Sequence, residues 1–177
     1  MPSIRYDNAS YRLHGELPTV GSLAPDIKLV DTRLRDVSLT HWIGMRKVMN
    51  VFVSVDSEAC AKSVVEFDRL ADGLDDVAML MVSYDLPFAH ARFNRDNKLE
   101  RVTSLSAIRH AGFGENYGVL IAEGPLAGMF ASAVVVIDEN NTIVHTEQIE
   151  DLAGEPDYGA VLRALGAQRE TNRGNHE

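Results

Sequence analysis

The chain has 177 residues, a formal net charge of −9 and a hydrophobic fraction of 45%, which suit one domain with a sizeable core. The acidic balance and the absence of a basic block argue against nucleic acid and anionic membrane surfaces as partners. With no basic and apolar leader and no apolar run near about 18 residues, we expect a cytoplasmic protein without a membrane segment.

The predicted elements alternate between strands and helices along most of the chain. They begin with an N-terminal hairpin, because residues 3–6 and 11–14 alternate in character around a polar turn. Apolar runs, helical spacing and turn residues then predict the next elements. In chain order these are strands at 27–30, 37–39 and 47–53, a helix at about 58–72, a strand at 77–83, a helix at 87–95, a strand at 102–105, a helix within 106–117, strands at 133–137 and 142–145, and a helix at 157–165.

This order of elements predicts an α/β fold, a thioredoxin-like α/β/α sandwich with a mixed central sheet and an N-terminal β-hairpin. The turn at 138–141 is a strong hairpin signal, so the last two strands should pair antiparallel. We assign residues 1–167 to a single domain and residues 168–177 to a polar, frayed C-terminal tail.

Cys60 is the single cysteine, and it lies where the strand at 47–53 leads into the helix at 58–72. A thiol in the first turn of a helix faces unpaired backbone N–H groups and the positive end of the helix dipole, and both favour the thiolate. Because the thiolate is the nucleophilic form, Cys60 is a candidate reactive residue. The alternative is a buried structural cysteine, a common environment for this residue type.

Several stretches of the sequence resemble the atypical thiol peroxidases of the peroxiredoxin superfamily. They are residues 46–52, 83–89, 124–126, 133–140 and 155–158. The resemblance implies a thioredoxin fold, commonly a homodimer, and a peroxidatic cysteine at Cys60. The family motif has a threonine or serine three residues before that cysteine, where this chain has Ser57. The Ser57 hydroxyl is therefore expected to orient the peroxide, and it is equally suited to capping the helix.

Three positions depart from the family pattern. Val53 stands at the motif's proline, Ser132 at the active-site arginine, and Asn94 at the resolving cysteine. Loss of the arginine is the most serious change, because a cation beside a thiolate favours ionisation and binds the peroxide oxygens. The arginines on later elements that are candidates to replace it are Arg92, Arg95, Arg101 and Arg109.

We therefore interpret the chain as a one-cysteine thiol peroxidase that reduces hydrogen peroxide or organic hydroperoxides. Its sulfenic acid would be resolved by an external thiol, either a thioredoxin-like protein or a low-molecular-weight thiol. The alternative is a degenerate peroxiredoxin-fold dimer with a binding, sensing or structural role. We expect no cofactor and no metal, because the six histidines lack ligand spacing and one cysteine excludes a cysteine-based zinc cluster.

Overall fold

The structure is a computed structural model that describes residues 1–166. The predicted tail at 168–177 lies outside the described residues, as does the domain boundary at 167, so both stay predictions. None of the helices among residues 1–166 is long and apolar enough to cross a membrane.

A seven-stranded mixed sheet forms the centre of the molecule, with the strand order β10-β9-β5-β6-β7-β3-β4. Its strands are β3 (Leu29–Asp31), β4 (Asp36–Val37), β5 (Arg46–Val51), β6 (Val77–Ser83), β7 (Val102–Ser106), β9 (Ala133–Ile137) and β10 (Ile143–Gln148). β5, β6 and β7 run parallel, whereas β9 is antiparallel to β5 and pairs with β10 as the predicted hairpin. Every residue of β6 and β9 is buried, which explains their uninterrupted apolar runs.

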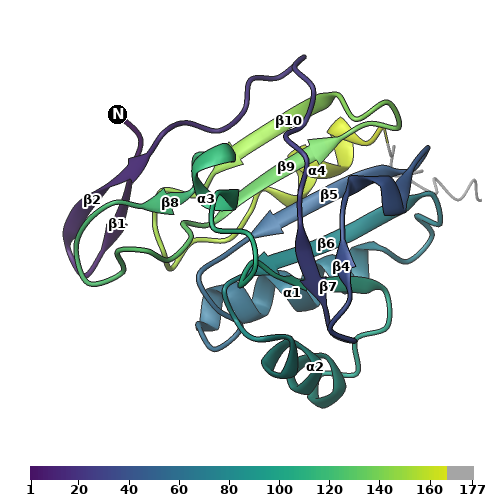
Figure 1. Ribbon diagram of the computed structural model, residues 1–177, viewed down its shortest axis with the longest axis horizontal. Helices are drawn as coiled ribbons and strands as arrows, with labels where there is room; N and C mark the ends of the chain where they lie inside the picture. Colours follow the sequence, from purple (N-terminus) through teal and green to yellow (C-terminus); the bar gives the residue numbers. More distant parts are fainter. Residues whose placement is uncertain (167–177) are drawn as a thin grey trace, which may run out of the picture.

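A second, three-stranded sheet combines the N-terminal hairpin with a short later strand. β1 (Ser3–Tyr6) pairs with β2 (Ala9–His14), which confirms the predicted hairpin, and β2 also pairs with β8 (Leu120–Ile121). These three strands lie together at one end of the molecule (Figure 1). β8 was not predicted, because two residues are too short to show an alternating pattern.

The helices agree with the predictions except for η1, which was not predicted. They are η1 (Leu39–Trp42), α1 (Glu58–Leu70), α2 (Pro87–Asp96), α3 (Phe113–Asn116) and α4 (Tyr158–Ala164). In the region 106–117 the predicted helix is the single turn of α3. The predicted strand at 37–39 was also wrong at its end, because Leu39 begins η1 and inserts its buried side chain into the core.

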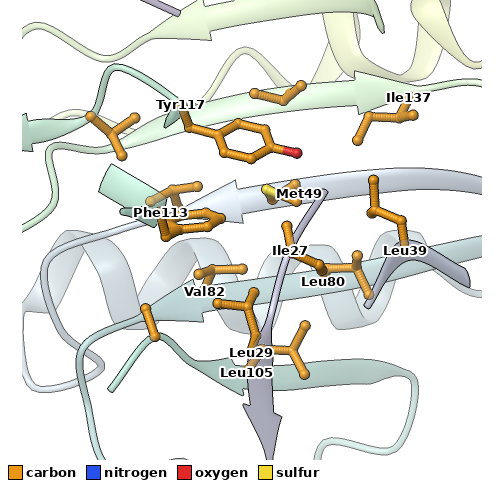
Figure 2. Close-up of a cluster of buried hydrophobic side chains, with 14 of the residues drawn as sticks. Ile27, Leu29, Leu39, Met49, Leu80, Val82, Leu105, Phe113, Tyr117 and Ile137 are labelled. Carbon is orange, nitrogen blue, oxygen red and sulfur yellow. The ribbon is translucent and has the colours of Figure 1, made fainter. Parts of the chain in front are cut away.

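Two hydrophobic clusters occupy the opposite faces of the central sheet. One contains Val64 and Phe67 of α1 together with Val161 of α4, so these helices cover the same face. The other contains Phe113 and Tyr117 and is shown in Figure 2. Because successive strand residues point to opposite faces, β5 supplies Val48 to the first cluster and Met49 to the second. The predicted sandwich is confirmed.

Candidate functional site

Cys60 lies in the first turn of α1, directly after the loop that leaves β5. Its side chain is only 3% exposed and packs in the same cluster as Phe52 and Val55. The first recorded hydrogen bond of this helix runs from the Ala61 N–H to the Ser57 carbonyl oxygen at 2.8 Å. The N–H groups of residues 58–60 therefore belong to the start of the helix, where backbone donors lack intrahelical acceptors and anions are favoured.

The loop before Cys60 is held by the carboxylate of Asp85. The Ser54 hydroxyl donates to Asp85 Oδ1 and the Val55 N–H donates to Asp85 Oδ2, both at 2.8 Å. A third donor is the Ser83 hydroxyl at 2.7 Å from Oδ2. β5 and β6 are parallel neighbours, so the segments that follow them meet at one edge of the sheet, and Asp85 reaches the loop from there. This carboxylate thereby sets the position of the residues that lead into α1.

His90 of α2 continues this network into the core. Ser83 Oγ already donates to Asp85 and accepts from the Asp85 N–H at 3.0 Å, so it accepts from His90 Nε2–H at 3.1 Å. This assignment leaves His90 Nδ1 unprotonated, and that atom is buried without a hydrogen-bond partner among the described residues. Burial lowers the pKa of His90 to about 4, although the Asp85 carboxylate acts in the opposite direction. His90 is therefore neutral near pH 7.

Ser57 occupies the N-cap position with an extended backbone, but its side chain makes no capping hydrogen bond. The expected capping role is thus not found among the described residues, and the hydroxyl remains available to another partner. Ser57 lines a cavity of about 490 Å³ between α1, the turn of the N-terminal hairpin and the loop before α4. The other residues that line it are Tyr6, Asp7, Glu58, Ala59, Lys62, Asp151, Leu152, Ala153 and Glu155.

Ser132 is the residue whose side chain meets the sulfur of Cys60. Its Oγ lies 4.0 Å from Cys60 Sγ, and both residues are buried. Ser132 directly precedes β9, whose pairing with β5 places Ala133 opposite Val51. The position at which the family has an arginine therefore does adjoin the candidate nucleophile, and here it carries an uncharged hydroxyl.

Comparisons with known proteins identify the family. Residues 19–162 match the Redoxin family model. The chain belongs to the Redoxin family. It is 42% identical to a thiol peroxidase from Corynebacterium glutamicum, over 85% of this chain and 91% of that protein. It is 45% identical to a thiol peroxidase from Mycobacterium bovis, over 86% and 92% of the two chains.

Solved structures agree with the Redoxin assignment. A thiol peroxidase from Chromobacterium violaceum superposes with a TM-score of 0.87 at 25% identity, covering 93% of this chain and 95% of that one. A peroxiredoxin-like protein from Aquifex aeolicus gives a TM-score of 0.86 at 28% identity, covering 95% and 98%. These similarities confirm both the predicted thioredoxin-like fold and the resemblance to thiol peroxidases of the peroxiredoxin superfamily.

The four arginines considered as replacements all form exposed ion pairs in this Redoxin chain. Their partners are Asp56 for Arg92, Asp96 for Arg95, Asp72 for Arg101 and Asp36 for Arg109, at 2.9–3.2 Å. Only Arg92 has its partner in the loop before Cys60. Lys62, the nearest cation along α1, pairs with Glu58 at 3.3 Å. No ion pair or hydrogen bond is recorded between a cation and Cys60 Sγ within residues 1–166.

The other two departures from the Redoxin pattern have defined surroundings. Val53 packs against the hydrophobic cluster that contains Cys60, so its apolar side chain helps to keep water away from that cluster. Asn94 exchanges hydrogen bonds with Ser104 of β7 at 3.0 and 3.2 Å. The amide at the resolving-cysteine position thus fastens α2 to the sheet.

Sequence reasoning missed the network of Ser83, Asp85 and His90. The first two lie in a stretch that resembles the family, but no role was predicted for them. The available signal was the placement of Asp85 two residues after β6, at the sheet edge where the carboxyl ends of parallel strands meet. Its partners in the loop at 54–55 could be named only with the structure.

Proposed function

We propose that the chain is a thiol-dependent peroxidase with Cys60 as the nucleophile and Ser57 as a hydroxyl that orients the peroxide. The observation that carries this proposal is the position of Cys60 in the first turn of α1, with an uncommitted Ser57 hydroxyl three residues before it. The relatives at 42% and 45% identity, both thiol peroxidases, support the same reaction. They disfavour the alternative of a degenerate fold with only a binding or structural role.

The reaction has two stages. The Cys60 thiolate attacks one peroxide oxygen, a sulfur–oxygen bond forms, and the oxygen–oxygen bond breaks. The sulfur is oxidised by two electrons to sulfenic acid, and the leaving oxygen takes a proton to become water or an alcohol. An external thiol then attacks the sulfenic sulfur and releases water, and a second thiol frees Cys60 from the mixed disulfide. The second stage needs an outside thiol because the sequence holds one cysteine.

The partners follow from this cycle. The substrate is hydrogen peroxide or an organic hydroperoxide, and the reductant is a thioredoxin-like protein or a low-molecular-weight thiol. A cytoplasmic location is part of the proposal, since reducing thiols are maintained in that compartment. We also propose a homodimer: Leu86 and Phe88, at the start of α2 beside Asp85, are 54% and 68% exposed.

Steady-state turnover tests the proposed function. The protein would be mixed with hydrogen peroxide or cumene hydroperoxide and with dithiothreitol, glutathione or a thioredoxin system, and peroxide loss followed. We expect multiple turnovers with at least one reductant and none with Cys60→Ser. Equal peroxide consumption by the native protein and Cys60→Ser would overturn the proposal. Light scattering during size exclusion, with Phe88→Ser as a variant, tests the dimer separately.

A further inference from the structure

Among residues 1–166, one side chain makes a hydrogen-bond contact with the Cys60 sulfur. That side chain is Ser132, whose Oγ lies 4.0 Å from Cys60 Sγ, a long contact for a hydrogen bond to sulfur. Cys60 is 3% exposed and Ser132 is 8% exposed, so water contributes little on this side of the sulfur. A negative charge on Cys60 there depends on the donors that the protein supplies.

The backbone at Ser132 is firmly held. Its carbonyl oxygen accepts from the Ile149 N–H at 2.9 Å and from the Gln148 side-chain amide at 2.8 Å. The next residue, Ala133, begins β9 and pairs with Val51 of β5. Ser132 therefore stays beside the end of the strand from which the Cys60 loop departs.

The hydroxyl of Ser132 has no other recorded hydrogen bond in the part of the chain that the structure describes. This distinguishes it from Ser63, another buried serine next to Cys60, whose hydroxyl donates to the Cys60 carbonyl oxygen at 2.8 Å and accepts from Asn50. The Ser63 hydroxyl is committed to the backbone and to a neighbouring amide. The Ser132 hydroxyl has no such second bond among residues 1–166, so its proton can be directed at the sulfur.

We propose that Ser132 is a further catalytic residue, whose hydroxyl donates a hydrogen bond to the Cys60 thiolate. Hydrogen bonds to ionised acceptors are shorter and stronger than those between neutral groups, so the contact should tighten when Cys60 ionises. Ser132 keeps its own proton throughout the cycle, since it stabilises charge without transferring a proton. The inference rests on the proposed role of Cys60 as nucleophile.

Alkylation of Cys60 by iodoacetamide near pH 7, followed by intact-protein mass spectrometry, tests this donor without using peroxide. We expect Ser132→Ala to react about five- to tenfold more slowly, which corresponds to a loss of about 1–1.4 kcal/mol in the stabilisation of the thiolate. Ser132→Thr, which keeps a hydroxyl, should stay close to the native rate. Ser104→Ala is the matched control, because it removes a buried hydroxyl that bonds to Asn94.

An unchanged or faster alkylation rate in Ser132→Ala would overturn the assignment. An equal loss of alkylation rate in Ser132→Thr would also overturn it, because it would show that altered packing, and not the lost hydroxyl, slows the reaction. Circular dichroism establishes that each variant is folded, and Ser132→Gly replaces Ser132→Ala if the latter is not. The rates of oxidation by hydrogen peroxide separate the two proposals. If the native protein is oxidised rapidly but Ser132→Ala is alkylated at the native rate, the proposed role of Ser132 is wrong and the proposed peroxidase function stands. If Ser132→Ala is alkylated more slowly but the native protein is oxidised no faster than free cysteine, the peroxidase function is wrong and the role of Ser132 stands.

Discussion

The two sides of Cys60 are built very differently. On one side, the loop that precedes it is bound to Asp85 through the Ser54 hydroxyl and the Val55 N–H, both at 2.8 Å. On the other side, the sulfur meets the Ser132 hydroxyl at 4.0 Å. The loop is fastened by bonds to a carboxylate, whereas the one polar contact found for the sulfur within residues 1–166 is long and uncharged. The groups that place the nucleophile are thus separate from those that would activate it.

This separation explains how the fold accommodates a change at an active-site position. An arginine at Ser132 would act on the sulfur and the peroxide, but the Asp85 network holds the loop without it. Hydrogen bonds to a charged group contribute about 1.5–3 kcal/mol each, well above what a long contact between sulfur and a neutral hydroxyl provides. Variants on the two sides should therefore affect stability and reactivity to different extents.

The largest effect is expected from Asp85→Ala. The buried donors of Val55 and Ser83 lose their acceptor, and each such loss costs about 1–3 kcal/mol, so unfolding free energy should fall by about 4 kcal/mol. Cys60 oxidation should slow as well, because the loop is no longer held. Urea denaturation and peroxide oxidation measure the two effects. Asp36→Ala is the control, since its exposed ion pair with Arg109 is worth less than about 1 kcal/mol. Equal free energies of unfolding for the two variants would show that Asp85 does not hold the loop as proposed.

Acidification should lower the free energy of unfolding through His90, which belongs to the hydrogen-bond network of Asp85. Its pKa is about 4 in the folded protein, against about 6.5 in an unfolded chain. Between these values the unfolded chain binds the extra proton, so stability is full above about pH 6.5 and falls as the pH drops toward 4. The loss from this residue should approach about 3 kcal/mol. Denaturation at pH 7 and pH 4.5 tests this. His90→Gln should flatten the difference, and an undiminished slope in that variant would count against the assignment.

Ser57→Ala should separate reactivity from stability. Because Ser57 makes no capping hydrogen bond, we expect unfolding free energy to change by less than about 0.5 kcal/mol, below the roughly 1 kcal/mol typical of a lost cap. Oxidation of Cys60 should slow by about tenfold or more if the hydroxyl orients the peroxide. Urea denaturation measures the free energy of unfolding, and intact-protein mass spectrometry measures the rate of Cys60 oxidation. A loss of stability with no change in rate would restore the capping role.

The smallest effect is expected from Arg92→Ala. The side chains of Arg92 and Asp56, which form an ion pair, are 51% and 72% exposed, and such pairs contribute at most about 1 kcal/mol to stability. We expect Cys60 oxidation within about twofold of the native rate, as for Arg109→Ala, because screening weakens exposed charges. A tenfold slowing confined to Arg92→Ala would identify it as the cation that replaces the missing arginine.

Sequence patterns predicted the parts of this fold that bury continuous apolar runs. The strand at 77–83 was predicted with the bounds of β6, because all seven of its residues are buried. The two-residue β8 and the four-residue η1 left no periodic signal. Within the site, the motif predicted which residues flank Cys60, and the family resemblance singled out Ser132. The contact between Asp85 and Val55 joins residues that are 30 apart in the sequence, and no local pattern encodes it.

The rate at which peroxide oxidises Cys60 shows whether the site activates this cysteine. Native protein and Cys60→Ser would be treated near pH 7 with hydrogen peroxide or a bulky organic hydroperoxide, and intact-protein mass spectrometry would follow the added oxygen. We predict oxidation orders of magnitude faster than that of free cysteine and absent in Cys60→Ser. A native rate no faster than that of free cysteine would contradict the proposed role of Cys60 and leave a Redoxin fold without an activated nucleophile.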